Sequence, residues 1–522
     1  MRTLLLLILM WTLPGVGLAQ TTPPDTAPDT PDTITPDNPL GPQGPRDDRA
    51  QARALAERSA AAFAKGDYAE SERLLREQLA LQPRNFVIHY NLASVRGLQG
   101  DGPGAIACLL DAVDHGFTDI ALAKRDPALE AARAQPDFAE LVDRWPDVLL
   151  ARLEANLAGN RTMFDKGYTE ARDEHLRLAY LSAFDTRSFD QAREEISRLG
   201  EWANTSVMPG ILDPVKQRED AWVVVVLPTR PHFNRWALAV YGASADRGTS
   251  MIAGSYEHDP KRLVSMDLGA TLRHEFFHVL HWRDMTRRGQ RHPIWIMEGL
   301  CSLVEDYDIT AATKDAPETL RPVPSWRTNV AKRLDKVNGL LPIEKLATMP
   351  QLRFTGSRPL ANYAQARAIF LFLSDQGKLK EWYTDYVGRY EQDPSGVASI
   401  EAVMGMPIAE VNAAYRQWLR DLPKVAEEIR PGMASLGLEV DAGTGEGPIV
   451  VSIARAPRAP RGEKRPDLKV SDIITAIDGK AVRDIAELVR VLSGYKPGDT
   501  VTVSYRRFRL YGDTEVTLVE KR

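Results

Sequence analysis

The most restrictive feature of this sequence is a pair of histidines four residues apart, His274 and His278, with Glu275 directly after the first. They lie in the stretch ATLRHEFFHVLHW, whose apolar spacing predicts a helix. Helical residues four apart lie one turn apart on the same face, so both imidazoles can bind one metal ion. Glu275 lies beside that face, where it can reach a metal-bound water. The chain must therefore fold around a helix that presents these side chains together.

Zinc is the metal that best suits such a pair, because catalytic zinc sites use three nitrogen or oxygen ligands and leave one position for water. Twenty residues after His278, the stretch PIWIMEGL offers the carboxylate of Glu298 on a second helical segment. His281 shares the face of the two histidines and is an alternative ligand. We expect a structural or supporting role for His281.

The stretches HEFFH and WIMEGL resemble the gluzincin metallopeptidases, whose third ligand is a glutamate in a W-x-x-E-G helix. The resemblance covers roughly residues 220–425 and implies a thermolysin-like α+β domain with an active-site cleft. It implies one zinc ion per chain, held by His274, His278 and Glu298, with Glu275 as the general base. The activity it implies is hydrolysis of peptide bonds by a zinc-activated water.

Two further residues are candidates for this site. Glu305 lies seven residues after Glu298, hence on the same helical face, and its carboxylate could accept the free N–H of a ligating histidine. The alternative is a solvated glutamate. Tyr363, in NYAQARAIFLFL, stands where aminopeptidase-like gluzincins carry a catalytic tyrosine, although Ala366 replaces the expected glycine; the alternative is a core aromatic. No GAMEN-like stretch precedes HEFFH, which favours an endopeptidase over an aminopeptidase.

The first residues predict export. Arg2 precedes an apolar run of about ten residues and a small-residue cleavage site at Gly17-Leu18-Ala19, the pattern of a secretory signal peptide. The run falls short of the roughly 20 residues needed to span a bilayer, and we expect no membrane span in the mature chain. We therefore expect an exported protein, periplasmic or secreted, of bacterial origin. The net charge of −5 argues against a nucleic-acid partner.

A repeat with a period of 34 residues follows the leader and a tether rich in Pro, Asp and Thr. Gly66-Asp67 recurs as Gly100-Asp101, and Leu75 recurs as Leu109. This period and the stretches around it resemble the tetratricopeptide repeat, whose stacked helix pairs bind peptides or proteins or serve as spacers. Two repeats cannot cover their own ends, so we expect a capping helical unit after them. Protein partners are therefore expected here.

The residues between the repeats and the histidine helix predict helices first and strands afterwards. Residues 147–205 are expected to form long amphipathic helices. Strands are expected at Trp222–Leu227, at Trp236–Tyr241 and at Leu263–Met266.

The C-terminal residues alternate between strand and turn patterns. The loop Leu436-Gly437-Leu438 precedes a strand, and Ile449–Ile453, the Asp478-Gly479 turn and the helix IAELVRVL follow in order. This order resembles a PDZ domain, although Ser471 replaces a usual glycine. The resemblance implies that Leu436, Gly437 and Leu438 bind the carboxylate of an extended peptide end. A plain β-domain without a ligand is the alternative.

The expected fold class is thus multidomain: all-α repeats, an α+β thermolysin-like zinc metallopeptidase domain and a β-rich PDZ domain. A scaffold or assembly factor with a vestigial metal site is the rival function, with repeats and PDZ domain binding partners. The expected boundaries are residues 1–19 for the signal peptide, 20–50 for a disordered linker, 51–146 for the repeats, 147–205 for a helical connector, 206–425 for the peptidase domain and 430–522 for the PDZ domain.

Overall fold

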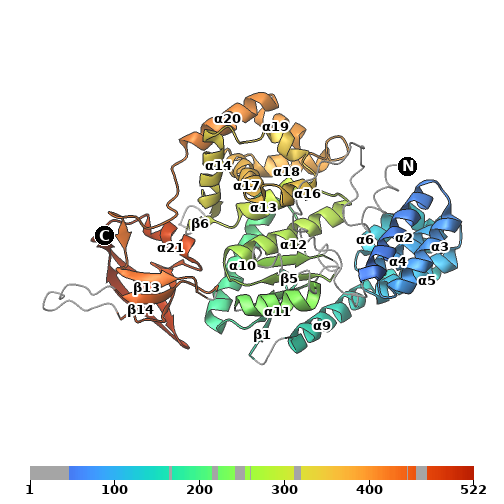
Figure 1. Ribbon diagram of the computed structural model, residues 1–522, viewed down its shortest axis with the longest axis horizontal. Helices are drawn as coiled ribbons and strands as arrows, with labels where there is room; N and C mark the ends of the chain where they lie inside the picture. Colours follow the sequence, from blue (N-terminus) through green and yellow to red (C-terminus); the bar gives the residue numbers. More distant parts are fainter. Residues whose placement is uncertain are drawn as a thin grey trace.

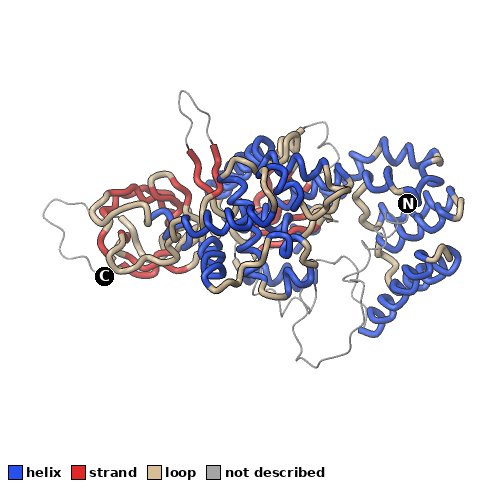
Figure 2. The backbone as a smooth tube through the Cα atoms, turned by 90° about the horizontal axis from the view of Figure 1, so that it is seen from above, coloured by secondary structure: helices blue, strands red, loops and turns tan. Residues whose placement is uncertain are grey.

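The computed structural model shows three parts side by side: a helical region at the N-terminal end, a mixed α/β middle part and a β-rich C-terminal domain (Figure 1). Figure 2 shows the first and last parts at opposite ends of the molecule. The expected signal peptide and most of the expected linker lie outside the described residues. The structure describes residues 46–163, 167–213, 221–227, 229–241, 253–258, 260–310, 319–443, 445–453 and 467–521.

The N-terminal part consists of antiparallel helices whose turns repeat as the sequence does. Gly66 and Gly100 both have positive φ angles, 79° and 81°, which glycine adopts without strain. Each is followed by an aspartate, Asp67 or Asp101, whose carboxylate caps the next helix by accepting a backbone N–H. The repeated Gly-Asp pair is therefore one helix-start signal used twice. The helices are α2 (Arg46–Ala64), α3 (Tyr68–Leu81), α4 (Phe86–Leu98) and α5 (Gly102–Asp114).

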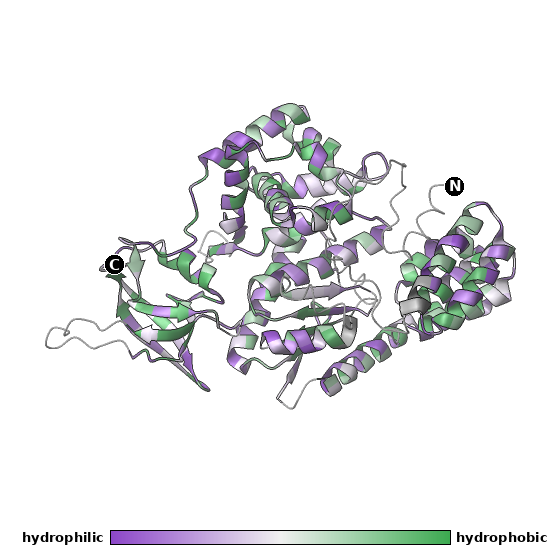
Figure 3. Cartoon of the chain, in the orientation of Figure 1, coloured by the Kyte–Doolittle hydropathy of each residue, from purple (hydrophilic) through white to green (hydrophobic). Residues whose placement is uncertain are grey.

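Shorter helices follow over the stretch where a capping unit was expected, and then a long one that leads into the middle part. Figure 3 shows hydrophobic and hydrophilic residues alternating around the helices of this N-terminal part, the pattern of helices buried on one side. These elements are α6 (Ile120–Arg125), η1 (Pro127–Leu129), α7 (Glu130–Arg133), α8 (Pro136–Asp143) and α9 (Trp145–Met163).

The middle part is built on a five-stranded mixed sheet in the order β1-β2-β3-β5-β4. The three central strands run parallel, and the two edge strands, β1 and β4, run antiparallel to their neighbours. All five residues of β2 and of β3 are buried, as central strands covered on both faces require. The strands are β1 (Thr169–Asp173), β2 (Leu178–Ser182), β3 (Trp222–Val226), β4 (Gly254–Glu257) and β5 (Arg262–Ser265).

Two expectations about this part were wrong. The segment 147–205 is not purely helical, because β1 and β2 lie within it and extend the sheet of the middle part. Residues Trp236–Tyr241 are not a strand but the end of α11 (Arg230–Tyr241). Phe233, Trp236 and Ala237 are buried together against the sheet, at a spacing of three and four that suits a helix.

Helices cover both faces of the sheet. The end of α9 and α11 pack on one face through Leu153, Leu157 and Trp236. On the other face lie α10 (Thr186–Ser206) and α12 (Ala270–Arg288), the helix that carries His274 and His278. A largely helical lobe covers the far side of α12 (Figure 1). Its helices are α13 (Ile294–Leu303), α14 (Trp326–Lys336), α15 (Ile343–Ala347), α16 (Gln351–Gly356), α17 (Pro359–Asp375), α18 (Leu379–Gly388), α19 (Val397–Met404) and α20 (Ile408–Asp421).

A β-hairpin, β6 (Tyr307–Thr310) with β7 (Thr319–Pro322), projects from the lobe next to the C-terminal domain (Figure 2). None of the helices in the described ranges is long and apolar enough to cross a membrane.

The C-terminal domain is a sheet in the order β14-β13-β11-β10-β9, with β12 paired to β11 and one main helix, α21. Strand β9 forms the edge of this sheet. A short pair, β8 with β15, joins the two ends of the domain. The elements are β8 (Ala434–Ser435), β9 (Leu438–Asp441), β10 (Ile449–Ile453), β11 (Ile473–Ile477), β12 (Lys480–Ala481), α21 (Ile485–Leu492), β13 (Thr500–Arg507), β14 (Leu510–Thr517) and β15 (Val519–Glu520).

Candidate metal centre

Helix α12 brings His274 and His278 to one side. Asp267 fixes the start of the helix, because its carboxylate accepts the backbone N–H groups of Gly269 at 2.8 Å and Thr271 at 3.1 Å. The helix ends at Gly289 in the left-handed conformation, with φ of 69°. Phe276 and neighbouring apolar side chains are buried in the core, so the helix cannot rotate about its axis without exposing them.

Helix α13 supplies Glu298, and the residue after it explains how. A Cβ atom on Gly299 would lie 2.5 Å from the ring of Phe370 and 3.2 Å from the backbone of Ala366. Only glycine therefore allows α13 and α17 to approach this closely. Trp295 stacks on Phe370 with ring centroids 5.0 Å apart, and its indole N–H donates to the carbonyl of Ser395. The tryptophan and the glycine of the W-x-x-E-G pattern thus pack α13 against α17, and this packing positions Glu298.

The side chains of His274, His278 and Glu298 converge, and one ligand atom from each lies within 4.8 Å of the others. Oε2 of Glu298 lies 3.3 Å from Nε2 of His274 and 3.6 Å from Nε2 of His278. Metal–ligand bonds of about 2 Å in a tetrahedron place ligand atoms roughly 3.3 Å apart. The donor set and its spacing therefore fit zinc, with one tetrahedral position left over.

Charge pairing holds this cluster together. Burial opposes the charging of His274, but hydrogen bonds with Glu298 and Glu305 outweigh it and raise the pKa of the imidazole to about 10. Burial likewise opposes the charging of Glu298, yet the neighbouring His278 and His274 hold the pKa of its carboxyl well below its usual range. These attractions keep three ligand side chains pointing at one place.

Glu305 lies directly behind His274. Its carboxylate is 3.0 Å from Nδ1 of His274 and binds Arg327 through both oxygens, at 2.6 and 2.9 Å. The glutamate is only 6 % exposed, so it is not a solvated side chain. Desolvation opposes its charging, but Arg327 and His274 lower the pKa of its carboxyl to about 2. A carboxylate here accepts the N–H at Nδ1 of His274, so Nε2 faces Glu298 and is the nitrogen that becomes free for a metal when the imidazole is neutral.

Glu275 lies on the same helix, next to strand β4. A Cβ atom on Gly254 of that strand would lie 2.7 Å from Cγ and 2.8 Å from Oε1 of Glu275, so the glycine leaves room for this carboxylate. Burial raises the pKa of Glu275, and the nearby His274 and His278 partly offset the rise. A partly desolvated carboxylate beside the ligand cluster has the environment of a general base.

Tyr363 reaches the same site from α17. Its ring packs on Phe354 at 5.3 Å, and the guanidinium of Arg327 lies 5.8 Å from its centre. Burial and then the charge of Glu298 raise the pKa of its phenol well above the usual value. Tyr363 therefore keeps its proton and can donate a hydrogen bond next to Glu298.

His281 does not join the cluster. It is fully buried, and its Nε2 lies 2.6 Å from Nδ1 of His292, with the two rings 4.8 Å apart. Burial, with a smaller contribution from His278, lowers the pKa of its imidazole to about 3. The pair lies in the core between α12 and the lobe, against Tyr383 and Tyr386.

Three residues at the site escaped the sequence interpretation. Tyr256, on strand β4, stacks on His278 with ring centroids 5.0 Å apart and the planes 15° from parallel. Arg327 holds Glu305, and Arg273, directly before His274, binds residues far along the chain. No strand was predicted around Tyr256, so no local pattern pointed to the first. No local pattern pointed to the two arginines either, because their partners are distant in sequence.

In the C-terminal domain, the loop Leu436-Gly437-Leu438 lies at the start of the edge strand β9. Gly437 has a φ of +71°, and its backbone N–H donates to Oγ of Ser435 at 3.2 Å. Leu436 is buried and Leu438 is half-buried, in one apolar cluster with residues of α21. The loop therefore lies at the start of β9, the edge strand of the sheet in the described part of the chain.

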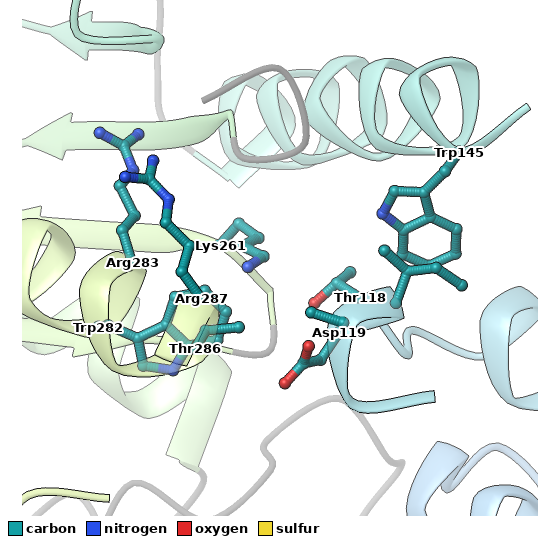
Figure 4. A pocket seen from close by; sticks show the side chains of 10 residues that line it. Thr118, Asp119, Trp145, Lys261, Trp282, Arg283, Thr286 and Arg287 are labelled. Carbon is teal, nitrogen blue, oxygen red and sulfur yellow. The ribbon is translucent and has the colours of Figure 1, made fainter. Parts of the chain in front are cut away.

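A small hollow marks the joint between the repeats and α12 (Figure 4). Its volume is about 50 Å³, and its walls include Asp119 from the repeats and Lys261 and Trp282 from the middle part. Nζ of Lys261 lies 3.5 Å from the centre of the Trp282 ring, a cation–π contact. Arg125 also donates to the carbonyl of Thr286 at 3.0 Å. The hollow has room for only a few water molecules and not for a peptide.

Comparison with known proteins assigns one domain. Residues 434–519 match the family model of the PDZ domain. Among solved structures, the chain is similar to an aminopeptidase N family protein from Idiomarina loihiensis, at 12% identity over 68% of this chain and 67% of that one. The TM-score of 0.26 is too low for that likeness to support any conclusion about this chain. No curated protein matches the sequence.

Proposed function

We propose that this chain is an exported zinc-dependent peptidase that cleaves within polypeptides. The observation that carries the proposal is the convergence of His274, His278 and Glu298 from two helices, with Glu275 beside them and Glu305 behind His274. Three nitrogen and oxygen ligands with a free fourth position are typical of catalytic rather than structural zinc sites. When bound, the zinc ion would supply Lewis-acid polarisation of water and of the substrate carbonyl.

Glu275 would act as the general base. It takes a proton from the attacking water and passes it to the nitrogen of the leaving amine. Its raised pKa, caused by burial, favours the first transfer, because a carboxylate that binds a proton more tightly is a stronger base.

Tyr363 would stabilise the charge that develops on the substrate oxygen. Its phenol keeps its proton because burial and Glu298 raise its pKa, so it can donate a hydrogen bond to an oxyanion. Arg327 supports this side of the site, since its guanidinium lies near the Tyr363 ring and also binds Glu305.

Strand β4 would hold the substrate in an extended conformation. It is an edge strand, and its outer side has no strand partner among the described residues. Gly254 on this strand adjoins Glu275, so a peptide hydrogen-bonded along β4 would pass the general base. Glu257, at the other end of β4, is buried and binds Arg262 at 2.5 Å. Its carboxylate stabilises the sheet rather than capturing a substrate's terminal amine, which favours internal cleavage.

The remaining modules would bind proteins. The PDZ domain supplies a strand edge and a Leu436-Gly437-Leu438 loop for the end of a peptide, and the tetratricopeptide-like helices supply a second surface for substrates or partners. No nucleic acid enters this proposal. Export to the periplasm or the cell exterior rests on the leader alone.

The test is metal analysis of the purified full chain together with digestion of a peptide library read by mass spectrometry. We expect one zinc per chain and cleavage inside peptides, both lost in His278→Ala. His175→Ala, which removes an exposed histidine of the same part, should retain both. A scaffold with a vestigial site would show no hydrolysis at any zinc occupancy, and full zinc occupancy in His278→Ala would overturn the ligand assignment.

A further inference from the structure

The residue before the first candidate ligand points away from the metal cluster and into the PDZ domain. Arg273 is 2 % exposed, and its guanidinium donates to Oε1 of Glu487 on α21 at 2.7 Å. The same nitrogen donates to the backbone carbonyl of Glu305 at 2.5 Å. One side chain of α12 thus binds both the PDZ helix and the residue whose carboxylate holds His274.

A second arginine and a second glutamate close this contact into a ring. Arg483 of the PDZ domain donates to Oε1 of Glu195 at 2.9 Å, and its backbone N–H donates to Oε2 of Glu487 at 2.8 Å. Glu195, on α10, lies 3.6 Å from Arg273. The charged side chains thus pair in the series Glu487–Arg273–Glu195–Arg483, and the backbone N–H of Arg483 completes the ring. All four side chains are buried. Removing four charged groups from water costs a large free energy unless each group is paired. The positions of these four side chains relative to one another are therefore tightly constrained.

Backbone contacts fix the start of α12 to the same domain. The N–H of Leu268 donates to the carbonyl of Gly445 at 2.9 Å. A Cβ atom on Gly445, whose φ is +78°, would lie 2.4 Å from the carbonyl oxygen of Met266. A Cβ atom on Gly269 would lie 2.8 Å from Cβ of Arg483. The PDZ domain and the first turn of the metal-binding helix are therefore packed backbone to backbone.

We propose that Glu487 of the PDZ domain is a positioning residue of the metal centre. It holds Arg273, which holds α12 and the backbone of Glu305, whose carboxylate orients His274. The PDZ domain is then an integral part of the metal-binding unit rather than a tethered module. This proposal rests on the proposed metal site, but the immobilisation of α12 by Glu487 is testable without metal.

The first test is hydrogen exchange of the metal-free full chain. Glu487→Gln removes the charge but not the volume, and we expect faster exchange at the amides of residues 270–278. Glu515→Gln, on an exposed position of β14 in the same domain, is the matched control and should exchange as wild type does. Exchange over α12 equal to wild type in Glu487→Gln overturns the proposal. The result is independent of whether the chain binds zinc or cleaves peptides.

The second test measures the metal site. Replacing an outer partner of a metal ligand weakens metal affinity about 10–100-fold. Glu487 lies two contacts beyond the outer partner Glu305, through Arg273, so we expect the low end of that range, a loss of about tenfold, in Glu487→Gln. The visible spectrum of the cobalt(II) form should change in Glu487→Gln and not in Glu515→Gln. Affinity and spectrum equal to those of wild type overturn the proposal. If wild type itself binds no metal, the proposed function fails and hydrogen exchange alone decides the positioning.

A double-mutant cycle distinguishes loss of the Arg273–Glu487 contact from misfolding of the PDZ domain. Arg273→Gln removes the same contact from the other side. If Arg273 and Glu487 act as one unit, Arg273→Gln/Glu487→Gln loses no more protection of α12 than the worse single variant. Additive losses would show that the two residues act separately and would overturn the proposal.

Discussion

The carboxylate of Glu305 lies 3.0 Å from Nδ1 of His274 while both of its oxygens bind Arg327. The guanidinium fixes the carboxylate, and the carboxylate fixes the imidazole. Nε2 of His274 is thereby aimed at Glu298, from which it lies 3.3 Å away. The orientation of the candidate ligand His274 therefore depends on residues that are not themselves candidate ligands.

Glu305→Gln should weaken zinc binding about 10–100-fold, because the amide leaves the orientation and the tautomer of His274 less well defined. Competition with a chelator measures the affinity. Glu410→Gln, an exposed position on α20, serves as the control and should bind zinc as wild type does. Unchanged affinity in Glu305→Gln would mean that His274 is oriented by its packing alone.

Tyr363→Phe should lower kcat by about 10²–10³-fold, as loss of one oxyanion donor does, with KM and zinc content near those of wild type. Tyr495→Phe, in the PDZ domain, is the control and should leave kcat unchanged. Steady-state kinetics on a cleaved library peptide measures both constants. Full turnover in Tyr363→Phe would mean that Tyr363 is a core aromatic and does not donate a hydrogen bond during catalysis.

Zinc binding should release protons. The pKa of His274 is raised to about 10 in the metal-free chain, so this imidazole is protonated at neutral pH and must lose its proton before it can bind zinc. We expect about one proton released per zinc from His274, and an affinity that falls as the pH falls. Calorimetry in two buffers of different ionisation enthalpy counts the protons, and a binding heat independent of the buffer would contradict the assignment.

The raised pKa of His274 also determines how the stability of the metal-free chain changes with pH. The folded pKa of His274 lies above its unfolded value of 6.5, so its pairing contributes stability below pH 6.5 and loses it as the pH rises toward about 10. The metal-free chain should therefore melt at a lower temperature at pH 10 than at pH 7. His274→Ala should show less of this decrease, and an equal decrease in both proteins would remove His274 as its source.

The PDZ domain should bind a peptide through its terminal carboxylate. Amidation of a bound peptide's C-terminus removes the charge that the loop Leu436-Gly437-Leu438 would hold, and affinity should fall. Fluorescence polarisation with free and amidated forms of one peptide measures the difference. Equal affinity would mean that β9 binds internal segments instead.

Short-range patterns predicted the parts of the molecule that depend on neighbouring residues. The four-residue spacing of His274 and His278 predicted one helical face, and the Gly-Asp turns predicted two equivalent helix starts. PDZ strands and the helix Ile485–Leu492 also followed from local alternation and turns. These features are set by a few adjacent side chains.

Contacts between residues distant in sequence determine the features that local patterns did not predict. The segment Trp236–Tyr241 was predicted to be a strand, whereas burial against the sheet at helical spacing makes it part of a helix. Arg273 lies 214 residues before Glu487, and Arg327 follows Glu305 by 22, so no local pattern links either pair. Only the fold brings these charges together.

The most direct measurement of the central proposal combines turnover and zinc stoichiometry on one preparation of Glu275→Gln. The amide keeps the volume of the side chain and removes the base, while His274, His278 and Glu298 remain. We expect zinc content near that of wild type. Turnover should fall by about 10²–10⁴-fold, the usual contribution of general base catalysis. Wild-type turnover in Glu275→Gln would contradict the assignment of α12 as the catalytic helix.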